Sequence, residues 1–184
     1  MFEKLKRIRI NNRIDFSKFD CGCDDLNDFI KNDALNYYEQ LLAVTYIYMF
    51  DNEPVAFVCF SNDKIHCDLI EKKKSKSQRR KFQNIFPHSK RLNSYPAVKL
   101  GRLGVDKKYK GENIGTSIIL TSMAWFLDKN KTGCRFMTVD AYLNNDVYKF
   151  YEKLKFKQLV PPEDNAKTVL MYFDLYTIYK SFAM

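Results

Sequence analysis

The order of the predicted elements indicates an α/β (α+β) fold, in which a mixed β-sheet carries helices on both faces. Segments with apolar residues at every second position alternate along the chain with segments whose apolar residues have helical spacing. We predict a strand from Ala97 to Asp106, a helix from Ile114 to Asp128 and another strand from Arg135 to Ala141. Two strands joined through a helix make a right-handed crossover and lie parallel, so the sheet is expected to contain a parallel pair.

The N-terminal part predicts a strand, a helix and a β-hairpin. Lys6 to Asn11 has the composition of a strand, and Asp24 to Tyr38 has apolar residues at helical spacing. The next two strands, Val44 to Phe50 and Pro54 to Phe60, flank Asp51-Asn52-Glu53. Such residues favour a tight turn, and hence an antiparallel pair.

The C-terminal part predicts a helix from Asp146 to Leu154 and two strands, Phe156 to Val160 and Thr168 to Tyr176. The final segment, MYFDLYTIYKSFAM, is rich in aromatic residues and either completes the sheet or pairs with a second copy. A monomer and a homodimer both stay open.

Length and hydropathy indicate one soluble domain. A chain of 184 residues can bury one sizeable core, so we expect a single domain over 1–184, with a polar insertion at about 63–95. No apolar run is long enough to span a bilayer, and charges interrupt the start MFEKLKRIRI. These features predict a cytoplasmic protein without a membrane segment.

Cysteine and histidine are too scattered to predict a metal centre. Cys21 and Cys23 have the wrong spacing for a zinc site, and the only histidines are His66 and His88. The odd number of cysteines favours free thiols. We therefore expect no metal.

The segment LGRLGVDKKYKGENIGTS is the most informative part of the sequence. A strand ends at Asp106, and a loop with Gly111 and Gly115 opens the helix that begins at Ile114. Small residues and bare N–H groups before a helix start make a concave anion site that the helix dipole reinforces. A pyrophosphate fits such a site, although an ordinary strand-to-helix turn has the same composition.

The same segment resembles the cofactor signature of GNAT N-acetyltransferases, Gln/Arg-x-x-Gly-x-Gly/Ala. Lys110 stands at the Gln/Arg position, Asn113 at the first Gly and Gly115 at the last. One of the three signature residues is therefore retained. Asn tolerates the left-handed backbone better than most residues, which makes its replacement of Gly acceptable.

A second segment, DAYLNNDVYKFYEKLKF, is similar to a later element of the same family, Asn-x-x-Ala-x-x-Phe/Leu-Tyr-x-x-x-Gly-Phe. Four positions match: Asn144, Phe150, Tyr151 and Phe156. Val147 replaces the Ala and Lys155 the Gly. Two incomplete motifs in the right order, with a predicted strand between them, support each other.

The beginning of the chain resembles one GNAT branch, which contains tRNA-acetylating toxins. Phe19-x-Cys21-Gly22 and the apolar residues after it are similar to the opening of that branch, and so are the polar insertion and the Leu-x-Arg-Leu stretch around Arg102. The similar segments run from Phe19 to Phe156.

The resemblance implies a central, mostly antiparallel sheet of about six or seven strands, with a V-shaped splay between strands 97–106 and 135–141. It implies that acetyl-CoA is the cosubstrate and that the amides of Leu103, Gly104 and Val105 bind its arm and thioester oxygen. The pyrophosphate would then be held by the loop and the helix start: Lys110, Gly111, Glu112, Asn113, Ile114, Gly115 and Thr116.

The resemblance also makes Tyr151 the general acid that protonates the departing thiolate, whereas an aromatic residue in this chain is otherwise expected to pack in the core. The base stays unassigned among Asp140, Glu112, Glu152 and water. Asn144 either bonds the cofactor or caps the following helix. Arg102 either faces a substrate phosphate or points to solvent.

The net charge of +9 favours polyanionic partners. The basic segment 72–91 is either a track for tRNA phosphates or a solvated face. Three interpretations follow: an N-acetyltransferase of a primary amine on a small molecule, peptide or protein, a toxin-like acetyltransferase of aminoacyl-tRNA, and an inert relative that binds coenzyme A or a partner. The departures from the family motifs support the third.

Overall fold

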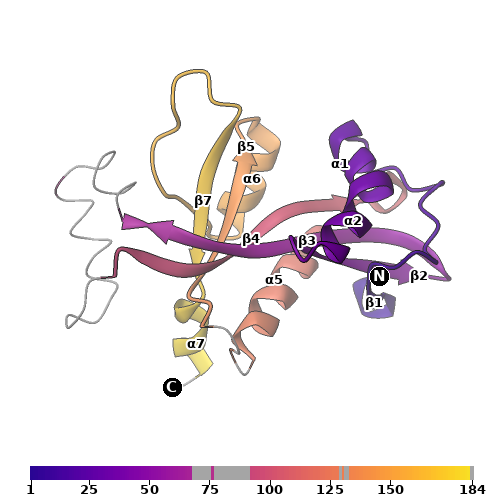
Figure 1. Ribbon diagram of the computed structural model, residues 1–184, viewed down its shortest axis with the longest axis horizontal. Helices are drawn as coiled ribbons and strands as arrows, with labels where there is room; N and C mark the ends of the chain where they lie inside the picture. The colour runs from indigo at the N-terminus through magenta and orange to yellow at the C-terminus, as the bar shows by residue number, and fades with distance from the viewer. Residues whose placement is uncertain (68–75, 77–91, 129, 131–132, 183–184) are drawn as a thin grey trace. The chain divides into compact units, whose positions relative to one another are not determined.

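The computed structural model describes residues 1–67, 76, 92–128, 130 and 133–182. Within them, seven strands are hydrogen bonded in the order β1-β2-β3-β4-β5-β7-β6 (Figure 1). Their bounds are β1 Lys6–Arg9, β2 Val44–Phe50, β3 Glu53–His66, β4 Ser94–Val105, β5 Phe136–Tyr142, β6 Lys157–Gln158 and β7 Thr168–Asp174. The mixed, mostly antiparallel sheet with flanking helices confirms the predicted fold class.

Helices lie between these strands much as the apolar spacing predicts. They are α1 Asp24–Asp28, α2 Ala34–Glu39, α5 Ile114–Leu127, α6 Asn145–Lys153 and α7 Tyr176–Phe182. A π-helical turn, η2 (Phe29–Asp33), joins α1 to α2, and the 3-10 turns η1 (Phe2–Lys4) and η3 (Lys107–Tyr109) are short. The single helix expected over Asp24 to Tyr38 is therefore present with a π turn at its centre.

The chain divides into two compact units, and β3 and β4 run through both. The first unit comprises Met1–Asn62 and Leu100–Asp128, and the second comprises Asp63–Lys99 and Lys129–Met184. The expectation of a single domain over 1–184 stays a prediction.

In the first unit the hairpin between β2 and β3 forms as predicted. Asp51 and Asn52 have φ values of 47° and 63°. Two successive residues with positive φ give the turn whose twist matches that of antiparallel strands. The antiparallel register then runs from Phe50 opposite Glu53 to Val44 opposite Phe60.

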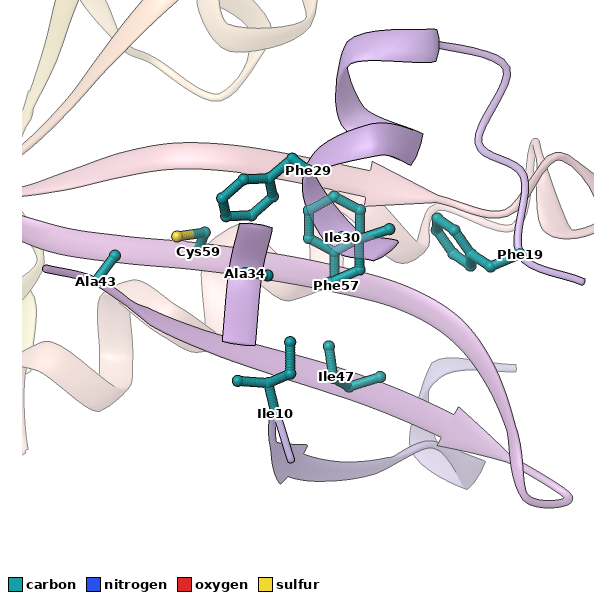
Figure 2. Packing of buried hydrophobic residues seen from close by; sticks show 9 residues of the cluster. All are labelled: Ile10, Phe19, Phe29, Ile30, Ala34, Ala43, Ile47, Phe57 and Cys59. Carbon is teal, nitrogen blue, oxygen red and sulfur yellow. The ribbon is translucent and has the colours of Figure 1, made fainter. Parts of the chain in front are cut away.

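The first unit buries aromatic and aliphatic side chains on both faces of its strands. Helices α1 and α2, with η2 between them, cover one face, where Phe29, Ile30 and Ala34 pack on Ile47 and Phe57 (Figure 2). Helix α5 covers the opposite face (Figure 1). There its Trp125 and Phe126 rings lie 5.1 Å from the rings of Tyr46 and Phe60, respectively. Successive side chains of β2 and β3 point to opposite faces of the sheet, so each strand contributes to both sets of contacts.

In the second unit, β5 pairs along its whole length with β7, from Phe136 opposite Asp174 to Tyr142 opposite Thr168. A buried cluster on one face includes Phe136 and Tyr172. Helix α6 packs against β5, and the Tyr151–Phe156 and Phe156–Phe173 ring pairs join α6 to β7.

The parallel pair expected from the strand–helix–strand unit is formed by β4 and β5. Its register runs from Ala97 opposite Phe136 to Lys99 opposite Thr138. Beyond these pairs β4 continues to Val105 and β5 to Tyr142. The V-shaped splay of the two strands stays a prediction.

Two predicted strand boundaries are wrong. Strand β3 extends past Phe60 to His66, and β4 begins at Ser94 rather than at Ala97. The strand continues because Ile65 is buried and Asp63, two residues before it, accepts the hydroxyl of buried Thr138, whereas Lys64 and His66 are exposed. The polar composition conceals this alternation. Apart from Lys76, the basic segment 72–91 lies outside the described residues.

The last strands are also shorter than predicted. Strand β6 covers Lys157–Gln158 alone, and β7 ends at Asp174. The aromatic tail completes the sheet only up to that residue and then forms α7, because the Asp174 carboxylate accepts the backbone N–H of Tyr176 (3.1 Å). This contact satisfies a free donor at a helix start.

Replacing Gly104 with Ala is expected to destabilise the protein by about 1–3 kcal/mol through overpacking. A Cβ at Gly104 would lie 3.0 Å from Cζ of the Phe57 ring, which is fully buried and cannot move away. The matched control is Gly101→Ala in the same strand, where the nearest atom is the Cys59 carbonyl oxygen at 3.7 Å. Urea unfolding should separate the two variants, and equal stabilities would contradict the packing argument.

Candidate active site

The predicted cofactor strand ends in a tightly packed part of the first unit. Gly104 is buried and its backbone lies against the Phe57 ring, while Leu103 and Val105 are half-buried. Asp106 follows, and its N–H donates to the carbonyl oxygen of Val55 (2.8 Å). A glycine is needed here because of this close approach.

A pair of aspartates braces the loop that leaves this strand. Asp106 is buried, and its carboxylate accepts the N–H groups of Lys108 (2.9 Å) and Asp20 (3.1 Å). Asp20 in turn accepts the N–H of Lys107 at its carbonyl (2.9 Å) and pairs with Lys107 Nζ through its carboxylate (2.5 Å). The loop is thereby tied to the segment that enters α1.

The carboxylate of Asp20 is stabilised in its charged form. Hydrogen bonds from the Lys107 ammonium, then from the Asn27 amide and the Gly22 N–H, hold the pKa of Asp20 well below its ordinary value. The cofactor motif does not contain Asp20. The only signal in the sequence was its place just before the predicted first helix.

The loop presents backbone donors at the start of α5. Gly111 has a φ of 94° and Asn113, the N-cap residue, has φ 55° and ψ 18°. Asn113 therefore adopts the left-handed conformation that the motif's glycine would supply. Among the hydrogen bonds of the described residues, none has the N–H of Ile114, Gly115 or Thr116 as its donor. These N–H groups and the helix dipole favour an anion.

The remaining predicted pyrophosphate residues surround this helix start. Lys110 and Glu112 are exposed, Thr116 is half-buried and Ile114 is buried. The structure thus brings the loop and the helix start together in one unit. Their binding of a pyrophosphate stays a prediction.

Asn144 caps helix α6. Its Oδ1 accepts the N–H of Val147 at 2.9 Å. The capping role that the sequence left open is therefore present, and a role in cofactor binding stays a prediction. Asn144 and Tyr151 both belong to the second unit, at the start of α6 and inside it.

Tyr151 is a buried aromatic residue whose hydroxyl is not engaged. The side chain is 6% exposed, and its ring lies 5.2 Å from Phe150 and 5.4 Å from Phe156. In the part of the chain that the structure describes, its hydroxyl makes no hydrogen bond and is not among the fully enclosed polar atoms. Burial raises the pKa of Tyr151 above its ordinary value.

Lys155 has the backbone conformation of the glycine that it replaces. Its φ is 66°, and its N–H closes the end of α6 by donating to the carbonyl of Glu152 (2.9 Å). The next N–H, that of Phe156, donates to the carbonyl of Tyr151 (3.1 Å). The departure at this motif position therefore keeps the local backbone geometry.

The three candidate bases differ in their surroundings. Asp140 forms an ion pair with Lys99 (2.5 Å), whereas Glu112 and Glu152 are exposed. No geometric feature selects one of them. Within the described residues, His, Cys, Asp and Glu form no group of three or more that could hold a metal ion.

The family to which the chain belongs defines its class, that of the acyltransferases. The Acetyltransferase (GNAT) family model matches residues 15–156. The chain belongs to this family, whose enzymes use acetyl-CoA as cosubstrate, and the predicted enzyme class and cosubstrate are thereby confirmed.

Solved structures share the fold over nearly the whole chain. AtaT complexed with acetyl-methionyl-tRNAfMet is 22% identical with a TM-score of 0.77, and covers 97% of this chain and 99% of its own. A tyrosine-to-phenylalanine mutant of KacT is 22% identical with a TM-score of 0.75, and the match covers 97% of this chain and 99% of KacT. AtaTR bound with acetyl-CoA is 20% identical with a TM-score of 0.74, and the match covers 98% of this chain and 99% of the AtaTR chain.

No described helix is long and apolar enough to cross a membrane.

Replacing Asn113 with Gly is expected to stabilise the protein slightly, and Asn113→Ala to destabilise it by about 1 kcal/mol. The reason is the φ of 55° at this position, which glycine adopts freely and a Cβ-bearing residue without a polar group does not. Thermal melting of both variants provides the measurement. A more stable alanine variant would show that Asn113 is not held in the left-handed region.

Proposed function

We propose that this chain transfers the acetyl group of acetyl-CoA to a primary amine by direct attack, with Tyr151 as the general acid. The observation that carries this proposal is the Tyr151 hydroxyl, which makes no hydrogen bond within the described residues and belongs to a buried side chain with a raised pKa. It lies on α6, at the motif position of the family's tyrosine.

The environment of Tyr151 suits a proton donor. Because burial raises its pKa, the phenol stays protonated throughout the physiological range. The thiol formed from the departing thiolate has an ordinary pKa of about 8.5, so at pH 7 the protonated thiol is the stable product and the sulfur takes up a proton as the C–S bond breaks. The phenol can then deliver its proton to sulfur.

The end of β4, the loop after it and the start of α5 supply the binding groups in this proposal. The free N–H groups at the start of α5 and the loop Lys110 to Thr116 bind the pyrophosphate. The amides of Leu103 to Val105 bind the pantetheine arm and polarise the thioester carbonyl. The amine nitrogen attacks the carbonyl carbon, the C–S bond breaks, and the nitrogen loses its proton to water or to a carboxylate.

Removing the Tyr151 hydroxyl with Tyr151→Phe is expected to lower kcat by about 10²–10⁴-fold, the usual contribution of a general acid. The ring contacts are kept, so the stabilisation of the protein by acetyl-CoA in thermal melting should equal that of the wild type. Tyr148→Phe, on the same helix, is the matched control and should keep full activity.

Acetyl transfer from labelled acetyl-CoA, compared across spermidine, a lysine-containing peptide and methionyl-tRNA, provides the rate. Unchanged turnover in Tyr151→Phe would remove this residue from the mechanism. Melting that does not respond to acetyl-CoA, together with no turnover on any amine, would favour the inert relative.

A second, more specific candidate is the acetylation of the α-amino group of an aminoacyl-tRNA. Its support is the likeness to AtaT complexed with acetyl-methionyl-tRNAfMet over 97% of this chain. The net charge of +9 favours a polyanionic acceptor. The opening around Phe19 and the stretch around Arg102 resemble the same branch.

The pH dependence of kcat/KM distinguishes the acceptor classes. An α-amino group has a pKa of about 7.7–8.0, so kcat/KM with methionyl-tRNA should rise to about pH 8 and then level off. A lysine side chain, with a pKa of about 10.4, should give a rise that continues to about pH 10. No fall is expected over this range, because the raised pKa keeps Tyr151 protonated. A decline beginning below about pH 9 would contradict the assigned acid.

A further inference from the structure

Arg102 is a partly enclosed cation that has no anionic partner among the described residues. It lies on β4, two residues before Gly104, and is half-buried. Its Nε–H is fully enclosed and donates to no partner within the described part of the chain, where no carboxylate forms an ion pair with the guanidinium. An enclosed charged donor is costly unless something compensates for the lost water.

Aromatic stacking provides part of that compensation and fixes the guanidinium in place. The Arg102 Cζ lies 4.0 Å from the centroid of the Phe29 ring, which is 1% exposed. Phe29 itself contacts the rings of Tyr37 (5.6 Å) and Phe57 (6.2 Å). It is also the first residue of the π-helical turn, a geometry frequent at functional sites.

The polar atoms beneath Arg102 cannot neutralise it. Cys59 is buried, and burial raises the pKa of its thiol, so the sulfur stays uncharged. Thr45 pairs with Cys59 in the register of β2 and β3, and its enclosed hydroxyl is uncharged as well. No described side chain therefore neutralises the charge of Arg102, and the guanidinium is available to bind an anionic ligand.

We propose that Arg102 binds an oxyanion carried by the acetyl acceptor, an inference that rests on the proposed function. Because Nε is enclosed, the anion contacts the two terminal nitrogens, end-on. The planar fork of a guanidinium matches two oxygens of a phosphate or a carboxylate. Arginine thus selects an anionic acceptor over a polyamine.

The side of the strand excludes the cofactor's pyrophosphate as this anion. Arg102 faces Phe29, on the side of the first unit that η2 and its neighbouring helices cover. Helix α5, whose first N–H groups are the predicted pyrophosphate site, packs on the opposite face through Trp125 and Phe126. The arginine and the pyrophosphate loop therefore serve different ligands.

The first test compares two acceptors that share an amine and differ in charge. Methionyl-tRNA carries phosphates, and methionine amide carries no anion. Arg102→Gln should raise KM for methionyl-tRNA roughly ten- to hundredfold, the usual value of a hydrogen bond to a charged group. It should leave KM for methionine amide and for acetyl-CoA unchanged, and Arg102→Lys should fall between wild type and Gln.

Arg7→Gln is the matched control. Arg7 also stacks on aromatic rings, 4.8 Å from Trp125 and 5.4 Å from Tyr46, but on the α5 face. It should leave all three KM values unchanged. Equal losses with both acceptors in Arg102→Gln, or a raised KM for acetyl-CoA, would overturn the proposal.

The second test needs no turnover and so separates this inference from the proposed function. The Nε–H signal of Arg102 in the NMR spectrum of ¹⁵N-labelled protein is assigned by its loss in Arg102→Gln. Saturable movement with inorganic phosphate alone indicates a phosphate ligand, and movement with acetate indicates a carboxylate. A signal that moves with neither anion would overturn the proposal, whatever the enzyme's activity.

Discussion

The close approach of the Phe57 ring to the backbone of Gly104 is the constraint on which the first unit depends. Phe57 is fully buried, and its ring contacts Phe19 (5.8 Å) and Phe29 (6.2 Å). One side chain of β3 thereby joins β4 to the segment before α1 and to η2. The same packing supports Phe29, the ring under Arg102. The Phe57 ring therefore helps to fix a strand, a helical segment and the ring on which a cation stacks.

Electrostatics then decides how the loop after β4 is held. The chain has an excess of nine positive charges, yet the loop is organised by two carboxylates. Asp106 accepts backbone donors from both sides, and Asp20 pairs with Lys107. These contacts fix a backbone that ends in unpartnered N–H groups at the start of α5. A rigid set of donors binds an anion without paying for its own ordering.

Much of the fold was predictable because its signals are local. The turn at Asp51 and Asn52, the crossover helix and the alternation along β2 all appear where the sequence indicates them. The end of β3 at His66 was not predictable, because the burial of Ile65 depends on residues distant in the chain. The end of β7 at Asp174 was missed because the cap on Tyr176, although local, lies within an aromatic-rich segment. Of the candidate site, the left-handed backbone at Asn113 was anticipated, since the motif demands it. The brace at Asp20 and Asp106 was not, since the two residues are 86 positions apart.

The sequence by itself determined the family, the order of the elements and the residue types at the cofactor loop and on α6. Those features are written in short windows, where spacing and side-chain chemistry are sufficient. Only the tertiary structure decided what the surroundings make of each side chain. Tyr151 is one of twelve tyrosines, and burial with an unengaged hydroxyl sets it apart. Arg102 is one cation among many, and the enclosure of its Nε over Phe29 sets it apart from the others. The burial of a side chain and its contact partners depend on residues far apart in the chain, so a short stretch of sequence does not specify them.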